Sequence, residues 1–267
     1  MTILKEMLGS ELKLSDIIMG AFAQIGYDFN GLPDKMYINR IRTTPLECVI
    51  PKIPVDDKLT NHGEQAVLFL PDSVRRRPKL LDPILRRFPN YLLYGTRRDI
   101  ISGNPLETYQ QLEELCDSSL RCIQEKGIDP DSLTVLGICT GNSPATILAS
   151  RLSARNLYSV LSAGEISEGV FSSDATKNEL ADLTLAGIDK ESYHKLVRDF
   201  DPIRNLDKNI GNIIGVFGGT DRMAKRSAWE PLAKKIEEVG GEVRVYKNLG
   251  HCATLYKFTR DLERKYI

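Results

Sequence analysis

The stretch Leu133–Ala149, LTVLGICTGNSPATILA, decides the fold. It opens with a short apolar run that contains β-branched residues, which is typical of a buried strand. A tight turn, Gly137–Gly141, follows, and the small and apolar residues after it have helical spacing. Glycines are needed on either side of Cys139 because a side chain at either position would collide with the strand or the helix. The stretch therefore predicts a strand, a sharp turn and a helix, with Cys139 within the turn.

The pattern G-x-C-x-G at such a turn is typical of a nucleophile held at the edge of a sheet. The backbone N–H of Thr140 would then lie at a helix N-terminus, where an oxyanion can be bound. A simpler interpretation exists, since a cysteine at a strand-to-helix turn is more often a packing residue. The rest of the chain is needed to choose between the two.

From Ala66 onward, strands alternate with helices. Apolar runs predict strands at Ala66–Leu70, Tyr91–Tyr94, Leu133–Leu136, Leu157–Leu161, Ile213–Phe217 and Glu242–Tyr246. Helical spacing predicts helices at Pro78–Phe88, Pro105–Gly127 and Ala228–Val239. Such an alternation implies right-handed β-α-β crossovers. We therefore expect residues 1–267 to form a single α/β domain, with a mostly parallel sheet flanked by helices.

Two segments depart from this alternation. Residues 1–65 form a divergent N-terminal segment, with helices expected within 1–35, two short strands within 35–53 and a polar loop over 54–64. Residues 164–209 form a helical insert after the fourth strand, with helices expected at Lys177–Leu185 and Lys190–Phe200. We expect the insert to be a lid. Its apolar stripe would line a substrate pocket with Leu180, Leu183, Leu185 and Leu196. The alternative is a covering layer that does not move.

Composition excludes several classes of protein. Lys and Arg number 36, as do Asp and Glu, so the formal net charge is zero. This balance lacks the basic footprint of a protein that binds nucleic acid or a membrane surface. The run Arg75-Arg76-Arg77 is local, and we expect it to be a solvated face. No apolar run approaches the roughly 20 residues that a membrane helix needs, and the N-terminus lacks the apolar core of a signal peptide.

The five cysteines are an odd number and include no C-x-x-C pair. That usage argues for a reducing compartment and against a disulfide scaffold or a zinc site. We therefore expect a cytoplasmic protein that needs neither a metal nor another cofactor.

A thiol attacks a carbonyl only as the thiolate, so Cys139 needs a base. His62, in a loop, and His194, in the insert, are expected to be exposed or packed histidines. His251 directly follows the last strand, and Asp221 follows the strand before it. Because the carboxyl ends of parallel strands meet at one crevice, both side chains are expected to lie near Cys139. A histidine base also needs an orienting acid, a role that suits Asp221.

The region Ala66–Phe258 resembles the α/β-hydrolase superfamily. The motifs that match are LGICTG at the nucleophile turn, VFGGTD at the acid and NLGHC at the histidine, in the chain order of that fold. The resemblance implies that Cys139 is the nucleophile, that Asp221 orients the histidine, and that His251 is the base and later the acid.

The sequence departs from the family at the oxyanion hole. Where the family often has His-Gly after its oxyanion-loop strand, this chain has Leu70-Pro71-Asp72-Ser73. Proline has no N–H, so Asp72 and Ser73 are the candidates for the donor that would complement Thr140. A second departure is Asn142 after the turn, where a small residue is commoner.

A cysteine in this turn resembles polyhydroxyalkanoate synthases, dienelactone hydrolases and some thioesterases attached to polyketide or peptide synthesis. The resemblance implies a thioesterase, another hydrolase or an acyltransferase that forms an acyl-cysteine from a thioester or ester. The expected partner is a small acyl substrate, presented as a carrier-protein or coenzyme A thioester, with no nucleic acid. Two alternatives remain. One is a malonyl-transferase-like starter-unit acyltransferase with a Cys-His dyad. The other is an inactive, hydrolase-like binding scaffold.

Overall fold

The structure is a computed structural model that describes residues 54, 56–59, 63–96 and 104–264. The helices expected within 1–35 and the strands expected within 35–53 lie outside the described residues, as does His62.

The described residues contain a seven-stranded sheet in the order β1-β3-β2-β4-β5-β6-β7. The strands are β1 Asp56–Asp57, β2 Gln65–Pro71, β3 Tyr91–Thr96, β4 Leu133–Ile138, β5 Asn156–Val160, β6 Asn212–Gly218 and β7 Glu242–Tyr246. Only β1 is antiparallel to its neighbour, and the other pairs are parallel. The mostly parallel sheet is thus confirmed, and each of the six predicted strands is present within two residues of its expected ends.

Strand β1 corrects the prediction of a polar loop over 54–64. Its two aspartates pair with Leu93 and Leu92 of β3. An edge strand of two charged residues has no apolar alternation, so the pattern that identifies strands did not predict it. The inner strands were predictable for the opposite reason. Every residue of β4 is buried, as expected for a parallel strand that helices cover on both faces.

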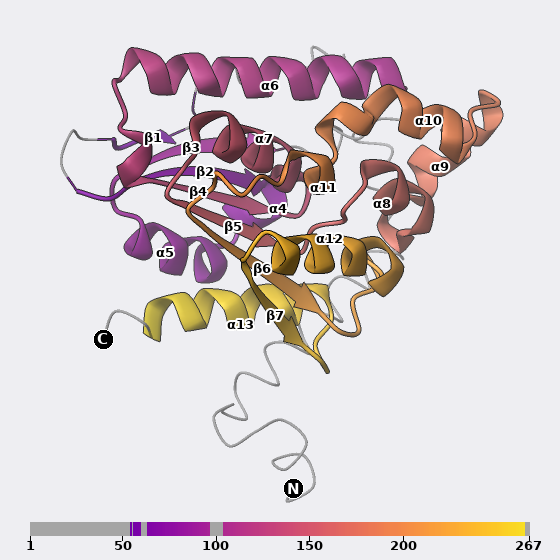
Figure 1. Cartoon of the computed structure of the whole chain (residues 1–267). Coiled ribbons are helices and arrows are strands. Elements are labelled where there is room, and N and C mark those ends of the chain that lie inside the picture. Colours follow the sequence, from indigo (N-terminus) through magenta and orange to yellow (C-terminus); the bar gives the residue numbers. More distant parts are fainter. Residues whose placement is uncertain (1–53, 55, 60–62, 97–103, 265–267) are drawn as a thin grey trace, which may run out of the picture.

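Helices cover the two faces of the sheet (Figure 1). Helices α5 (Pro78–Arg87) and α13 (His251–Arg264) pack on one face, and α6 (Pro105–Glu125), α7 (Asn142–Leu152) and α12 (Arg226–Glu238) on the other. The predictions of α5, α6 and α12 are confirmed. Helix α13 was not predicted, although its buried residues Leu255, Phe258 and Leu262 have helical spacing.

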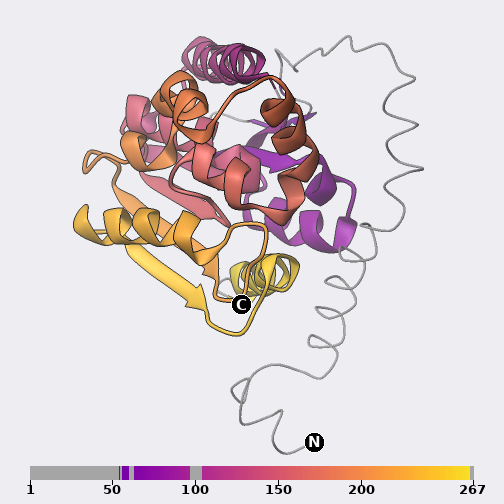
Figure 2. The same ribbon diagram turned by 90° about the vertical axis from the view of Figure 1, so that its right-hand side faces the viewer.

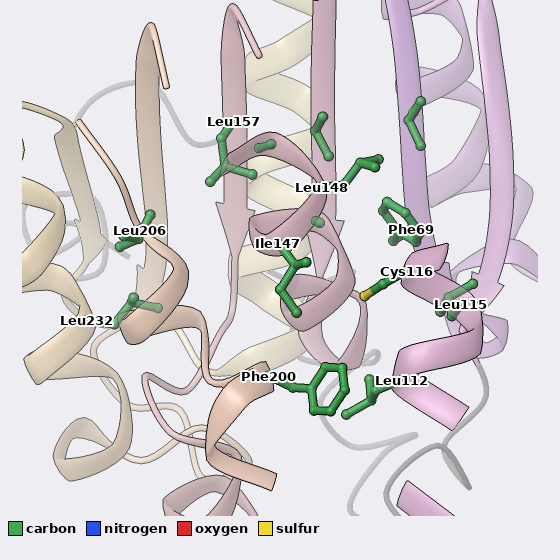
Figure 3. Close-up of a cluster of buried hydrophobic side chains, with 14 of the residues drawn as sticks. Phe69, Leu112, Leu115, Cys116, Ile147, Leu148, Leu157, Phe200, Leu206 and Leu232 are labelled. Atoms are coloured by element: carbon green, nitrogen blue, oxygen red, sulfur yellow. The ribbon is translucent and has the colours of Figure 1, made fainter. Parts of the chain in front are cut away.

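The larger core lies between the sheet and the layer of α6 and α7 (Figure 3). Leu112 and Cys116 of α6 lie near Ile147 of α7 within one buried cluster. Phe200, which belongs to the insert, points toward Leu112 in this cluster. The Phe200 ring also packs edge-on against Tyr109, with 5.0 Å between the ring centroids. The insert is therefore built into the main core.

The insert forms α8 (Ile166–Ser172), α9 (Lys177–Leu185), α10 (Lys190–Val197) and α11 (Pro202–Asn205), with a 3-10 turn at Arg198–Phe200. Its helices α8, α9 and α10 lie at the end of the molecule toward which the arrows of β6 and β7 point (Figure 1). Viewed from that end, they lie in front of the sheet (Figure 2). The insert therefore lies on the side of the sheet where the carboxyl ends of the strands meet, and its role as a lid stays a prediction.

The four leucines of the insert that were expected to line a pocket do not form a single apolar stripe, and Leu180 among them is half-buried. That any of them lines a substrate pocket stays a prediction. Leu183 is fully buried in the main core, whereas Leu185 is 87% exposed and Leu196 is 40% exposed. Leu185 is the last residue of α9, so it extends beyond the packed face of that helix. On α10 the buried residues are Tyr193 and Val197, which leaves Leu196 at the side of the buried face.

Candidate active site

The chain turns sharply at Cys139, between β4 and α7. Cys139 has a φ of 52°, in the left-handed region that a residue other than glycine rarely adopts. The 3-10 turn Cys139–Gly141 then leads directly into α7. Cys139 is partly exposed, whereas Cys116 and Cys252 are buried. The strained backbone and the exposure are both features of a turn that presents its side chain to a ligand.

The two glycines of the turn are sterically required, as the sequence predicted. A Cβ at Gly137 would lie 2.7 Å from the Cβ of Ala145 and 2.8 Å from the Cα of Asn142, both in α7. A Cβ at Gly141 would lie 2.2 Å from the carbonyl oxygen of Phe69 in β2. Gly137 therefore lets the helix approach the strand, and Gly141 lets the turn approach the neighbouring strand.

Asn142, which departs from the family pattern, fastens this turn to β5. Its Nδ2 donates to the carbonyl oxygen of Cys139 at 3.0 Å and to that of Val160 at 2.8 Å. The side chain is only 1% exposed. The amide therefore ties the strained turn to the carboxyl end of β5, a function that the spacing of the motif gave no means of predicting.

Asp221 and His251 form a buried pair after β6 and β7. The Oδ2 of Asp221 lies 2.8 Å from the Nδ1 of His251. The Oδ1 of Asp221 accepts backbone N–H groups from Met223 at 2.8 Å and from Ala224 at 3.0 Å. Asp221 is 6% exposed and His251 is 7% exposed. These hydrogen bonds fix the orientation of the carboxylate and, through it, that of the imidazole ring.

Backbone hydrogen bonds join the loop that contains Asp221 to the loop that leads to His251. Gly219 donates to the carbonyl oxygen of Tyr246 at 3.0 Å, and Thr220 donates to that of Leu249 at 3.2 Å. Helix α13 begins at His251 itself. The histidine is therefore held by a loop on one side and by a helix on the other.

The electrostatic surroundings of His251 also connect it to Cys139. Burial lowers the pKa of His251, but the charge of Asp221 and its hydrogen bond outweigh burial and raise the pKa well above the ordinary 6.5. A hydrogen bond with the side chain of Cys139 raises it further. Because Nδ1 faces Asp221, Nε2 is the ring nitrogen left for the sulfur. The structure thus brings together the three residues that the sequence singled out, and their catalytic roles stay predictions.

The expected oxyanion donors lie at the same edge of the sheet. Thr140 follows Cys139 in the turn, and its Oγ1 lies 3.2 Å from the Oγ1 of Thr96 at the end of β3. Asp72 and Ser73 open the short helix α4 (Asp72–Arg75) directly after β2, the strand that the nucleophile turn touches. That any of them binds an oxyanion stays a prediction.

His194 lies in a second polar cluster, within the insert, and has partners of its own. Its Nδ1 lies 3.2 Å from the Oγ of Ser167, 3.5 Å from an Oδ of Asp201 and 3.8 Å from a carboxylate oxygen of Glu165. Asp201 is fully buried, and burial raises its pKa to about 7. His194 is half-buried, which agrees with the expectation of an exposed or packed histidine. The buried aspartate beside it was not predicted.

In the part of the chain that the structure describes, no group of three or more His, Cys, Asp or Glu side chains is placed to hold a metal ion. Among the same residues, no helix is long and apolar enough to cross a membrane.

No family model matches the sequence, and no curated protein resembles it significantly in sequence. Solved structures do resemble its fold. The esterase domain of a Rhodothermus marinus protein has a TM-score of 0.51 at 9% identity, and the match covers 78% of this chain and 89% of that one. A carbohydrate esterase from gut microbiota has a TM-score of 0.50 at 13% identity, over 77% of this chain and 86% of that one.

A puromycin-hydrolyzing peptidase of Mycobacterium tuberculosis has a TM-score of 0.52 at 10% identity. That match covers 76% of this chain but only 34% of the peptidase. At such identities the likeness establishes the fold alone, which is the α/β-hydrolase type expected from the motifs.

Proposed function

We propose that this protein is an acyl-transfer enzyme in which Cys139 forms a covalent acyl intermediate. The observation that carries the proposal is the chain of contacts from Asp221 through His251 to Cys139, which has a strained backbone and a partly exposed side chain. A packing cysteine needs none of these features. The esterase-type fold, with the cysteine between a strand and a helix, supports the same conclusion.

In the first step, the Sγ of Cys139 attacks the acyl carbonyl carbon, and the thiol proton resides on Nε2 of His251. The raised pKa of His251 favours this transfer, because a proton held by the imidazole leaves the sulfur as the nucleophilic thiolate. Asp221 keeps Nδ1 protonated and stabilises the imidazolium.

In the second step, the tetrahedral intermediate collapses. The bond from the carbonyl carbon to the leaving group breaks, His251 protonates that group, and the acyl chain stays on the sulfur. Water or another acceptor then attacks the carbonyl carbon of the acyl-cysteine and gives its proton to His251. The bond from that carbon to Sγ breaks, the acyl product leaves, and His251 returns the proton to the sulfur. The N–H of Thr140, with one from Asp72 or Ser73, would hold the oxyanion, and one such donor typically contributes about 3 kcal/mol.

A thioester is the substrate class that suits a thiol nucleophile. Exchange of an acyl group between two sulfurs is nearly isoenergetic, so the acyl group can pass on to an acceptor as well as to water. The malonyl-transferase-like alternative uses a Cys-His dyad that needs no aspartate, and the 2.8 Å contact between Asp221 and His251 favours the triad over it. The scaffold alternative predicts an inert Cys139, which alkylation of the native protein with iodoacetamide tests directly.

Turnover of a short acyl thioester by two histidine variants tests the proposal. His251→Ala should lower kcat by roughly 10³-fold, the usual size of a general-base effect, and leave binding of a non-cleavable thioether analogue intact. The matched control is His194→Ala, which removes the histidine of the insert and should keep kcat within about threefold. Equal losses in the two variants would contradict the assignment of His251.

A further inference from the structure

A hydrogen bond between two threonines joins the nucleophile turn to the end of β3. The Oγ1 of Thr140, the residue after Cys139, lies 3.2 Å from the Oγ1 of Thr96, the last residue of β3. Strand β3 is not a neighbour of β4, because β2 lies between them. The side chain of Thr140 therefore reaches across the carboxyl end of β2 to make this contact.

The carboxyl end of β2 is also where the second oxyanion donor is expected. In the sheet, Thr96 pairs with Pro71, the last residue of β2. Asp72 and Ser73, the candidates for that donor, follow Pro71 directly in the chain. The hydroxyl of Thr140 therefore lies beside the start of the segment that is expected to complete the oxyanion hole.

The proposed base lies on the other side of Cys139. In the strand order, β2 and β3 lie on one side of β4, and β6 and β7 lie on the other. Cys139 follows β4 directly, and His251 follows β7 after a short loop. A carbonyl group at Cys139 therefore has the histidine on one side and the hydroxyl of Thr140 on the other, as acyl transfer requires.

The burial of the two hydroxyls decides the direction of their hydrogen bond. Thr96 is fully buried, and a buried hydroxyl proton that has no acceptor destabilises the fold. Within the described part of the chain, the Oγ1 of Thr140 is the acceptor that lies within reach of this proton. Thr96 is therefore the donor. Thr140 is partly exposed, and its own hydroxyl proton is left for another acceptor.

The hydroxyl and the backbone N–H of Thr140 are placed to act on the same atom. Only Cα and Cβ separate the backbone nitrogen of a threonine from its Oγ1, so both donors can converge on one oxygen. An oxyanion accepts hydrogen bonds more strongly than the carbonyl oxygen from which it forms. A donor at this position therefore stabilises the tetrahedral intermediate more than the substrate.

We propose that the hydroxyl of Thr140 is a catalytic donor that binds the oxyanion of the tetrahedral intermediate, and that Thr96 is a positioning residue that directs this hydroxyl. The proposal rests on the function proposed above, because an oxyanion forms only if Cys139 attacks a carbonyl group. The hydroxyl donates a hydrogen bond, and its proton stays on Thr140 throughout.

Two reactions of one thiol separate the stabilisation of an oxyanion from the reactivity of the sulfur. Acylation of Cys139 by valeryl-pantetheine passes through an oxyanion. Alkylation by iodoacetamide displaces iodide at a saturated carbon, so no oxyanion forms. The quantity measured is the second-order rate constant of acylation divided by that of alkylation, with both reactions followed by intact mass.

Thr140→Val keeps the shape of the side chain and the backbone N–H, and it removes only the hydroxyl. It should lower the ratio at least about tenfold, as expected for the loss of a hydrogen bond to a charged group, and leave alkylation within about threefold. Thr140→Ser restores a hydroxyl and should return the ratio to within about threefold of the native value.

Thr96→Val tests the positioning role. The hydroxyl of Thr140 stays in this variant but is no longer directed, so the ratio should fall by a smaller factor, roughly threefold. In a protein that already carries Thr140→Val, the change Thr96→Val should have almost no further effect, because Thr96 acts through the hydroxyl that is missing. An unchanged ratio in Thr96→Val alone overturns the positioning role.

The matched control is Thr146→Val, which removes a buried threonine hydroxyl from α7. That hydroxyl donates to the backbone carbonyl oxygen of Asn142 at 2.8 Å, within the helix. The control should leave the ratio unchanged.

The outcomes separate this inference from the proposed function. An unchanged ratio in Thr140→Val overturns the inference. Equal losses of acylation and alkylation in that variant also overturn it, because the hydroxyl would then shape the turn and not act on the oxyanion. If iodoacetamide alkylates Cys139 in the native protein but valeryl-pantetheine does not acylate it, the proposed function fails, and the inference fails with it.

Discussion

The described part of the chain contains two buried aspartates that lie beside a histidine, Asp221 with His251 at the sheet edge and Asp201 with His194 in the insert. In the first pair, the carboxylate oxygen and the ring nitrogen are 2.8 Å apart. In the second pair the corresponding distance is 3.5 Å, and the same ring nitrogen also faces Ser167. The same residue types are therefore held in two different ways.

The backbone around each carboxylate explains the difference. Asp221 accepts two backbone N–H groups and the histidine, so both of its oxygens have partners. Asp201 accepts one backbone N–H, from Ile166 at 2.8 Å, and its other oxygen has no hydrogen bond. Glu165 adds a further negative charge that raises the pKa of Asp201 in addition to burial. Burial beside a histidine therefore leaves the pKa of Asp201 raised, because one of its carboxylate oxygens accepts no hydrogen bond.

The largest expected effect is the difference between replacing Asp221 and replacing Asp201 with asparagine. Asp221→Asn should lower turnover of an acyl thioester by roughly 10⁴-fold, because the amide favours the wrong tautomer of His251. Asp201→Asn should change turnover by less than about threefold. Steady-state kinetics of the two variants under identical conditions would measure both. A small loss in Asp221→Asn would favour a Cys-His dyad over a triad.

The second prediction concerns the pH dependence of stability in the insert. The pKa of Asp201 is about 7, above the usual 3.8, so the folded protein binds this proton more tightly than the unfolded chain. Its contribution to stability is fully present below about pH 4 and is lost as the pH rises to about 7. The contribution is at most about 4 kcal/mol. Asp201→Asn should remove this dependence from urea unfolding curves.

The control for that experiment is Asp182→Asn, which replaces an exposed residue of α9 that is not among the charges acting on Asp201. This variant should keep the pH dependence of the native protein. If Asp201→Asn also keeps it, the buried carboxyl does not hold a proton near neutral pH, and the contrast between the two pairs is wrong.

The smallest expected effect concerns Cys252, the residue that follows His251. Cys252 is buried, and burial raises the pKa of its thiol, so it is a poor nucleophile although it is adjacent to His251. Cys252→Ser should change acylation by a thioester by less than about threefold. The rate of iodoacetamide labelling should also stay unchanged, since the label is expected on Cys139. A large loss of labelling in this variant would mean that the reactive thiol had been misassigned.

Much of the fold was predictable because the inner strands are short apolar runs bounded by turns, and β7 even has its predicted ends. The parts that were missed lacked such a local signal. Strand β1 is two aspartates that exist as a strand only through pairing with β3. The exposure of Leu185 depends on where α9 ends, which helical spacing alone does not fix.

Residues of the candidate site also differ in whether the neighbouring sequence made them predictable. Cys139, Asp221 and His251 were identifiable because each follows a strand and because parallel strands end at one edge. Beyond these three residues, Arg75 was expected to be solvated, since nothing near it in sequence indicates that it packs on Gly95, twenty residues later. Asp201 was missed for a similar reason, because its burial depends on the packing of α8 and α10 rather than on its own helix.

The most direct test of the central claim is the intact mass of the protein after incubation with an acyl thioester such as valeryl-pantetheine. The native protein and Cys252→Ser should each gain the mass of one acyl group, and peptide mapping should assign that group to Cys139. Cys139→Ala should show no increase. An acyl group on Cys252, or acylation of Cys139→Ala at the native rate, would contradict the account.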